Sequence, residues 1–109
     1  MSKPRIGGLR HRLVLERGVR APDGGGGATR NWSAVAEIWA AIEPATGTES
    51  VVAEAISGRV SHAIYIRHRN DVLPAMRLRF GDRHFDIQAV LDVDNRRRFL
   101  KCLAQERGL

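Results

Sequence analysis

The sequence predicts a mainly β protein: a small antiparallel β-barrel or sandwich of about six strands, with long loops and one short helix. Apolar and polar residues alternate in several short segments, and a period of two indicates half-buried strands. Turn-forming residues separate these segments, and only one segment has helical spacing. Closure into a barrel would hide strand edges that could otherwise pair with other chains. With 109 residues, we expect one β-barrel domain that spans 1–109.

The first two strands are expected on either side of a glycine-rich loop. Leu9, Leu13 and Leu15 recur at even spacing, and His11 would share their inward face. Residues 32–42 predict the second strand, and because both of its faces are apolar we expect a central or interface strand. Four consecutive glycines between these strands have high backbone entropy and predict a mobile loop. No Gly-Lys-Ser or Gly-Lys-Thr follows them, so a phosphate-binding loop is not supported.

Residues 45–58 are expected to form a short helix inside a longer excursion from the barrel. Apolar residues from Val51 to Ile56 lie one helical turn apart, and Thr48 or Ser50 is placed to cap the start of the helix. The same residues are also compatible with an extended flap, so the sequence leaves both conformations open.

The second half of the chain predicts four strands. Residues 60–69 show the clearest alternation. Residues 76–80 and 85–93 predict a hairpin, because only a short polar turn with one glycine separates them. Residues 99–104 predict the last strand, on which Cys102 would be a small buried thiol.

Basic residues are concentrated at the two ends of the chain. The net charge is +5 over residues 1–20 and +4 over residues 96–109, whereas residues 21–95 carry −3. Arginine supplies 16 of the 18 basic side chains. This distribution suits an anionic partner or an acidic protein surface, although arginines that serve only solubility are an equal alternative.

No group of residues in the sequence predicts an active site, a metal site or a cofactor site. His62 and His68 would share a strand face but would stand about 20 Å apart, too far to bind one metal. The serines lack a Gly-x-Ser-x-Gly context, and the carboxylates are scattered on turns and outer faces. We therefore expect a protein that is not an enzyme and needs no cofactor.

The chain has no feature of a membrane or secreted protein. No apolar run approaches the ~20 residues that span a bilayer. The N-terminus continues into charged sequence without an apolar signal region. Cys102 is the single cysteine, so an intrachain disulfide is excluded. We expect synthesis and folding in a reducing cytoplasm.

A positive stripe is expected on the outer faces of two strands that would be neighbours. Its members would be Arg67, Arg69, Arg77 and Arg79, which are possible contacts to phosphates. Only Tyr65 is an aromatic residue on that face, so base stacking is poorly supported. Simple solvation of these arginines is the alternative to contact with nucleic acid.

The whole chain resembles the phage head–tail joining, or head-closure, family, which also occurs in gene transfer agents. Ile6-Gly-Gly-Leu-Arg-His-Arg12 is similar to the opening of the family. Glu37-Ile-Trp-Ala-Ala-Ile-Glu-Pro44, followed by Gly47 and Glu49, is similar to its second strand and the loop after it. His62-Ala-Ile-Tyr-Ile-Arg-His-Arg69 is similar to its hallmark strand. Met76-Arg-Leu and Gly81-Asp-Arg-His-Phe-Asp-Ile87 are similar to its final hairpin.

This resemblance implies a structural, non-enzymatic protein at the head–tail junction of a virion or gene transfer agent particle. It would form a homo-oligomeric ring, of twelve copies, below the portal or adaptor protein. A tail terminator or tail tube protein would bind below the ring. The ring would close the exit channel around packaged double-stranded DNA, which it would contact without sequence specificity.

Two segments are expected to make the contacts of such a ring. The excursion over 44–60 would face the channel or contact the ring above, and the loop over 18–31 would reach a neighbour or the tail. The residues expected in the first segment are Thr46, Thr48, Glu49, Ser50, Val51 and Glu54, and those in the second are Asp23, Gly24, Gly25, Gly26, Gly27 and Arg30.

Two other functions remain open. One is a tail-completion or neck adaptor protein with the same barrel. The other is a small nucleic-acid-binding barrel without sequence specificity, whose affinity would fall steeply with added salt.

Overall fold

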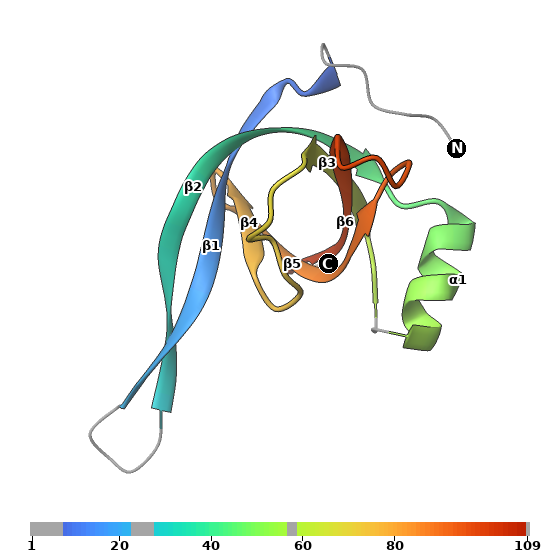
Figure 1. Cartoon of the computed structure of the whole chain (residues 1–109). Helices are drawn as coiled ribbons and strands as arrows, with labels where there is room; N and C mark the ends of the chain where they lie inside the picture. Colours follow the sequence, from blue (N-terminus) through green and yellow to red (C-terminus); the bar gives the residue numbers. More distant parts are fainter. Residues whose placement is uncertain (1–7, 23–27, 57–58, 109) are drawn as a thin grey trace.

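The computed structural model describes residues 8–22, 28–56 and 59–108. Within these residues it contains six strands and one helix. In chain order they are β1 (His11–Pro22), β2 (Ala28–Pro44), α1 (Gly47–Ile56), β3 (His62–Arg67), β4 (Arg77–Phe80), β5 (Arg83–Asp92) and β6 (Phe99–Glu106). The strands close into a barrel in the order β1-β2-β3-β6-β5-β4, and all neighbouring strands are antiparallel (Figure 1). The expected mainly β barrel with one short helix is therefore confirmed.

The interior of the barrel is filled by apolar side chains from all six strands. Leu13 and Leu15 of β1 and Phe85 of β5 are completely buried. Burial of each such side chain stabilises the fold by about 1.5–3 kcal/mol. Cys102 is also completely buried in this core, as the alternation of the last strand predicts. The inside of the barrel is a packed core and not a channel.

A second apolar cluster includes outward-facing residues of β3 and β6. It contains Ala63 and Tyr65 of β3, Leu103 of β6, and Leu9, which precedes β1. Leu9 belongs to this cluster and not to the barrel interior, so the expectation that it lies with the next two leucines is wrong. The expectation for His11 is also wrong, because His11 is exposed and its ring lies 5.0 Å from that of Phe80. The extra cluster explains why β3 is buried on both faces.

Residues 47–56 are helical, so the helix and not the extended flap is correct. The backbone N–H of Glu49 donates a hydrogen bond to Thr46 Oγ1 (3.1 Å), and the N–H of Thr46 donates one to Glu49 Oε1 (2.9 Å). This reciprocal pair is a capping box, which satisfies two backbone donors at the start of a helix. The cap is therefore Thr46, and the expectation that Thr48 or Ser50 caps the helix is wrong.

Two bulges interrupt the strand pairing. Val35 has no partner between the pairs that Leu15 and Glu16 form with β2, and Gln88 is skipped in the same way where β5 pairs with β6. A bulge bends its strand and increases the local twist. The bulge at Val35 lies where β2 leaves the barrel, and it therefore helps to direct the segment beyond it.

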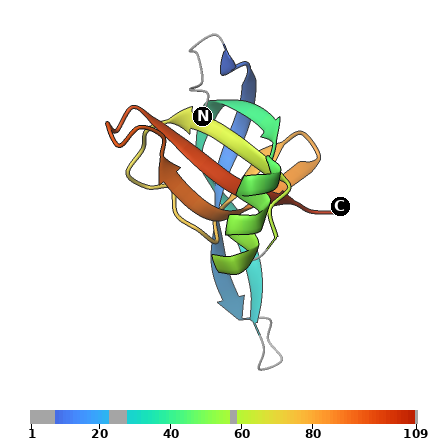
Figure 2. The same cartoon turned by 90° about the vertical axis from the view of Figure 1, so that its right-hand side faces the viewer.

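The molecule is elongated, with extents of 49 × 29 × 25 Å. Its length comes mainly from β1 and β2, which continue past the barrel as a hairpin, while α1 lies on the other side (Figures 1 and 2). Over the described ranges, α1 is too short and too polar to cross a bilayer.

Candidate assembly surfaces

The part of the hairpin beyond the barrel, residues 17–22 of β1 and 28–35 of β2, forms a two-stranded arm. β1 pairs with β4 over Val14–Glu16, and β2 pairs with β3 from Ala40 to Pro44. In the described part of the chain, the two strands of the arm therefore pair only with each other. A two-stranded ribbon is marginally stable in water, and its unpaired edges can bind another chain. The arm is therefore a candidate for contact with a neighbouring molecule.

A charged cluster fixes the base of the arm to the barrel. Arg77 Nε donates a hydrogen bond of 2.6 Å to Glu16 Oε1, and Arg79 Nε donates one of 3.3 Å to Glu16 Oε2. Burial of Glu16 opposes its ionisation, but the hydrogen bonds and charges of both arginines outweigh burial and lower its pKa. The guanidinium of Arg77 also lies 4.1 Å from the ring centroid of Trp32, a residue of the arm. One carboxylate thus links β1, β4 and the arm.

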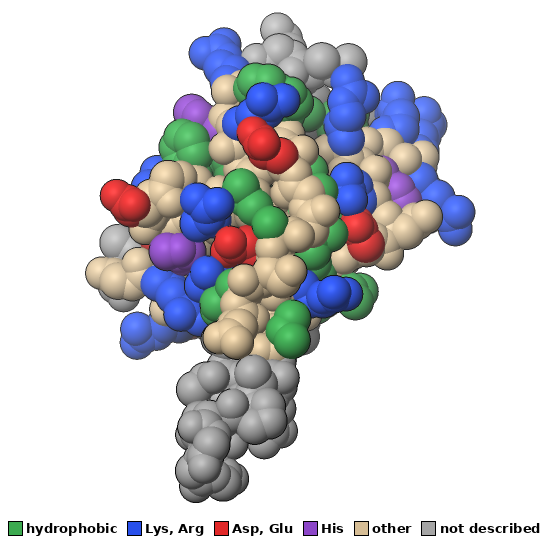
Figure 3. Space-filling model, turned by 90° about the vertical axis from the view of Figure 1, so that its left-hand side faces the viewer, with side chains coloured by type: hydrophobic (Ala, Val, Ile, Leu, Met, Phe, Trp, Pro, Cys, Tyr) green, Lys and Arg blue, Asp and Glu red, His purple; other side chains and the backbone are tan. Residues whose placement is uncertain are grey.

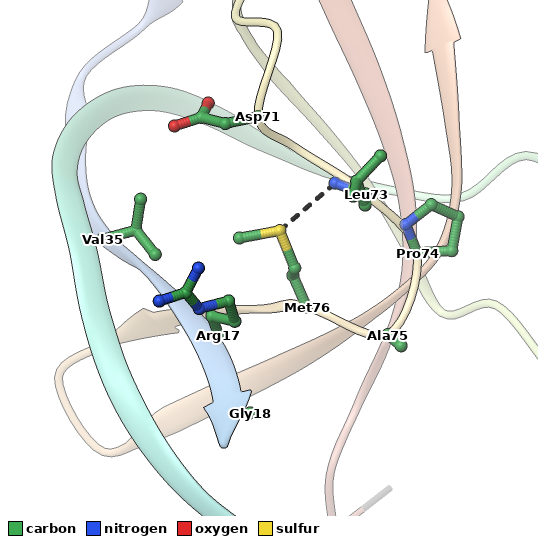
Figure 4. A pocket seen from close by; sticks show the side chains of 8 residues that line it. All are labelled: Arg17, Gly18, Val35, Asp71, Leu73, Pro74, Ala75 and Met76. Atoms are coloured by element: carbon green, nitrogen blue, oxygen red, sulfur yellow. Dashed lines mark hydrogen bonds between the residues drawn. The ribbon is translucent and has the colours of Figure 1, made fainter. Parts of the chain in front are cut away.

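A pocket of about 430 Å³ lies at the root of the arm, and we call it the root pocket (Figure 4). It lies between the arm and the loop that precedes β4. Its lining is mostly apolar, and Arg17 and Asp71 contribute charge. The lining residues are Arg17, Gly18, Val35, Asp71, Leu73, Pro74, Ala75 and Met76.

The loop wall of the root pocket has a well-defined conformation. Ala75 has a φ of +75°, in the left-handed region that residues with a Cβ rarely adopt. The N–H of Ala75 donates a hydrogen bond to the Ile87 carbonyl (3.1 Å), and the N–H of Ile87 donates one to the Met76 carbonyl (2.9 Å). These bonds to β5 hold the strained residue in place. The loop therefore presents Leu73, which is 60% exposed, in a fixed position beside the pocket.

The helix α1 is attached to the barrel by a buried ion pair. Lys101 Nζ, on β6, donates a hydrogen bond of 2.7 Å to Glu49 Oε2. Lys101 is 3% exposed, and its ammonium lies 5.4 Å from the ring centroid of Tyr65. Burial alone would lower the pKa of Lys101, but the contacts with Glu49 and Tyr65 outweigh it and raise the pKa. The pair therefore keeps both charges at neutral pH and fixes the first turn of α1.

The side of α1 away from this ion pair is open to solvent. Val51 is 68% exposed and Val52 is 51% exposed, and both Glu54 and Ala55 are exposed. Exposed valines on consecutive positions are unusual for a helix that packs only on its own barrel. The outer face of α1, which we define as Val51, Val52, Glu54 and Ala55, is therefore a second candidate for contact with another molecule.

The side of the molecule that carries the arm has a different charge from the side that carries α1. Figure 3 views the arm side, where Lys and Arg side chains are more prominent than Asp and Glu, with apolar side chains among them. On the other side, the sequence of α1, residues 47–56, contains two glutamates and no lysine or arginine. The two candidate surfaces thus differ in the sign of the charge around them.

Comparison with known proteins identifies the family. The family model of the phage head completion protein matches residues 4–107. The chain belongs to this family. The family is one of structural virion proteins, so this head completion protein has a structural role in the particle. The expected resemblance to the head-closure family is confirmed.

Two solved structures are similar to this head completion protein. The solution structure of protein SF1141 from Shigella flexneri 2a has a TM-score of 0.72 at 22% identity, over 95% of this chain and 97% of that chain, and this similarity concerns the fold. A chain in the virion of a native gene transfer agent particle has a TM-score of 0.63 at 29% identity, over 94% of each chain. No curated protein matches the chain significantly in sequence.

The residues expected in the 44–60 excursion fall into two groups in the structure, those that make contacts within the chain and those that are exposed. Thr46 and Glu49 form the capping box, and Glu49 also binds Lys101, so both are engaged within the chain. Val51 and Glu54 lie on the outer face of α1, and Thr48 is exposed at its start. Ser50 is half-buried. Their contact with a channel or with another ring stays a prediction.

The expected docking loop can be compared with the structure only in part. Asp23, Gly24, Gly25, Gly26 and Gly27 lie outside the described residues. Arg30 is on β2, where its backbone is opposite Arg20 of β1.

The expected positive stripe does not form, because β3 and β4 are not neighbours in the barrel. This corrects the expectation that Arg67 and Arg69 adjoin Arg77 and Arg79. Arg69 forms two hydrogen bonds of 2.8 and 2.9 Å to Asp71, which lower the pKa of Asp71. Arg77 and Arg79 both bind Glu16, whereas Arg67 is exposed at the end of β3. Contact of any of the four arginines with DNA stays a prediction.

The described residues contain no group of three or more His, Cys, Asp or Glu side chains placed to hold a metal ion. Cys102 is completely buried, and burial raises the pKa of its thiol to about 12. Its sulfur therefore remains a neutral thiol at physiological pH.

Sequence reasoning missed three features of these surfaces. The root pocket depends on the Val35 bulge and on the positive φ of Ala75, neither of which has a sequence signal. Burial of Lys101 also has none, since lysine is rarely buried. The capping box did have a signal, the Thr46-Gly-Thr-Glu49 pattern at the start of the helix.

Proposed function

We propose that this head completion protein is the subunit of a head-closure ring that seals the DNA exit channel and docks the tail. The observation that carries the proposal is the two-stranded arm on a chain of the phage head completion family. Such an arm has little stability of its own, so it suits a contact with a neighbouring subunit or the tail. Similarity to a chain of a gene transfer agent virion gives further support.

A ring is needed because one copy cannot surround DNA. The barrel interior is packed, and the molecule measures only 49 × 29 × 25 Å. A channel is therefore formed between copies. Head-to-tail contacts generate rings when the rotation closes, and twelve copies are proposed here from the resemblance to the head-closure family. The portal or adaptor protein lies above this ring and the tail below it, and residues 44–60 line the channel or meet the ring above.

Deletion of the gene tests the proposal. Heads without this protein are expected to package DNA and then lose it, and a plasmid-borne copy restores full particles. Full, stable heads that only lack tails would instead identify a tail-completion protein. Absence of the protein from the head–tail junction in electron micrographs of wild-type particles would overturn both assignments.

Binding by the isolated chain separates the third function, a nucleic-acid-binding barrel. A head-closure subunit is expected to bind DNA weakly as a monomer, because two of the four arginines of the expected stripe are held by Glu16. Strong, salt-sensitive binding by the monomer would favour the nucleic-acid-binding function.

A further inference from the structure

The arm, whose root forms one wall of the root pocket, lies on the opposite side of the barrel from α1 (Figure 1). In a closed ring each copy contacts one neighbour with one surface and the other neighbour with a different surface. Two surfaces on opposite sides of a subunit meet this requirement when they are complementary in shape, polarity and charge.

The shapes of the two surfaces are complementary. The root pocket is concave and open, and its wall carries Val35, which is 38% exposed, and Leu73, which is 60% exposed. The outer face of α1 is convex. Val51 and Ala55 are four residues apart on this helix and so lie on one face, with Val52 beside them. An amphipathic helix that places its apolar face in an apolar groove is a common mode of recognition.

The charges at the two surfaces are also complementary. Arg17 lines the root pocket and has no ion pair with any described residue, whereas the other charged residue there, Asp71, is bound by Arg69. Glu54 is exposed on α1, three residues after Val51, and it likewise has no ion pair within the described ranges. Docking of the helix would therefore bring an unpaired cation and an unpaired anion to the same contact.

From these observations we infer that the root pocket of one copy receives the outer face of α1 from the next copy in the ring. Val51 and its apolar neighbours enter the pocket against Val35 and Leu73, and Glu54 pairs with Arg17. The inference rests on the proposed ring. It uses one face of α1 and leaves Thr48, which is exposed at the start of the helix, for contact with the channel.

Cross-linking between copies tests this contact. The variant Val35→Cys/Val51→Cys, supplied as the only copy of the chain, is treated in intact particles with a short bismaleimide. Cys102 does not interfere, because it is buried and its pKa is about 12. We expect a ladder of covalent oligomers up to the closed ring.

The control Val35→Cys/Leu91→Cys pairs the pocket with an exposed leucine of β5 and is expected to give monomers. Monomers from the first variant, or equal ladders from both, would overturn the inference.

Charge reversal gives a second, independent test. Arg17→Glu and Glu54→Arg each place like charges together and are expected to lower the yield of complete particles by about tenfold or more. The double variant Arg17→Glu/Glu54→Arg restores opposite charges, and its yield should return to within about threefold of the wild type. Arg96→Glu, an exposed change on the turn between β5 and β6, is the matched control and should have little effect. A double variant that is as defective as the product of the single variants contradicts the contact.

The two proposals can fail separately. Electron microscopy of wild-type particles shows whether the chain forms a ring at the junction. A ring without the cross-link and without charge rescue refutes only the contact between α1 and the root pocket. Absence of the ring refutes the proposed function itself. Circular dichroism of each purified variant confirms folding, which the exposure of all the substituted side chains favours.

Discussion

Lys101 Nζ and Glu49 Oε2 are 2.7 Å apart, and this hydrogen-bonded ion pair joins the last strand of the barrel to the first turn of α1. The same carboxylate accepts the N–H of Thr46 through its other oxygen. Glu49 therefore caps the helix and attaches it to the barrel at once. One side chain thus contacts both the residue that caps α1 and the strand β6.

Replacement of Glu49 and replacement of Lys101 should both loosen the attachment of α1, and the loss of Glu49 should cost more. Glu49→Gln leaves the buried ammonium of Lys101 without a counter-charge and should lower the free energy of unfolding by about 2–3 kcal/mol. Lys101→Met keeps the apolar length of the side chain and should cost about 1 kcal/mol. Hydrogen exchange of the α1 amides should accelerate in both variants. Equal costs for the two variants would show that Lys101 is not effectively buried.

Thr46→Ala should weaken the start of the helix. It removes the hydroxyl that accepts the N–H of Glu49, and loss of such a cap costs about 1 kcal/mol. Thermal unfolding and helical circular dichroism measure the effect. Thr48→Ala is the matched control, since Thr48 is exposed and is not the cap, and a loss of the same size there would contradict the assignment of Thr46.

Glu16→Gln should destabilise the base of the arm. The change removes the charge that neutralises the half-buried Arg77, and we expect a loss of about 1–2 kcal/mol in chemical denaturation. The indole signal of Trp32 should shift, because Arg77 lies against its ring. Glu37→Gln removes an exposed pair with Arg12 and should cost less than about 0.5 kcal/mol. A similar loss in both variants would show that Glu16 has no special role.

Stability should fall in mildly acidic solution because of His62. Burial lowers the pKa of His62, and Arg83 adds to this, while Glu106 opposes it without reversing it. In the unfolded chain the histidine takes up a proton near its ordinary pKa of 6.5, before the folded chain does. The contribution of neutral His62 to stability is therefore fully present above about pH 6.5, and it is lost as the pH falls through the pKa that His62 has in the folded chain. Denaturation midpoints between about pH 8 and pH 5 should decrease less in His62→Gln. Parallel curves for the two proteins would exclude His62 as the cause.

Cys102 should react with thiol reagents only when the protein unfolds. Its side chain is completely buried in the barrel, and its pKa is raised to about 12. We expect no labelling by a maleimide in native buffer and complete labelling in denaturant, measured by mass spectrometry. Rapid labelling of the native chain would indicate that the barrel opens near β6.

The sequence was sufficient for the barrel because each strand repeats its apolar residues at a period of two. It failed where burial depends on distant residues. Leu9 continues the alternation of Leu13 and Leu15, yet it packs outside the barrel, since only the closed fold creates a second apolar surface there. The order of the strands is also set by closure, which separates Arg67 of β3 from Arg79 of β4.

The candidate surfaces were predictable to a smaller extent. The sequence located the helix that carries Val51 and Glu54, because helical spacing is a local property. The root pocket could not be located in this way, because it is built from a bulge at Val35 and a loop around Ala75. These two segments are distant in the sequence and lie together only in the folded chain. Both depend on backbone irregularities that side-chain patterns do not encode.

The barrel closes along a short seam, where β4 meets β1 over Val14–Glu16 alone. The arm is the direct continuation of that stretch of β1. A pull on the arm therefore enters the barrel as lengthwise shear across the seam, where the hydrogen bonds must break together and not in succession. The ion pair of Glu16 on β1 with Arg77 on β4 crosses the seam and opposes sliding of one strand along the other. A partner that pulls on the arm along the strand direction would therefore load this pairing and the ion pair of Glu16 with Arg77 at the same time.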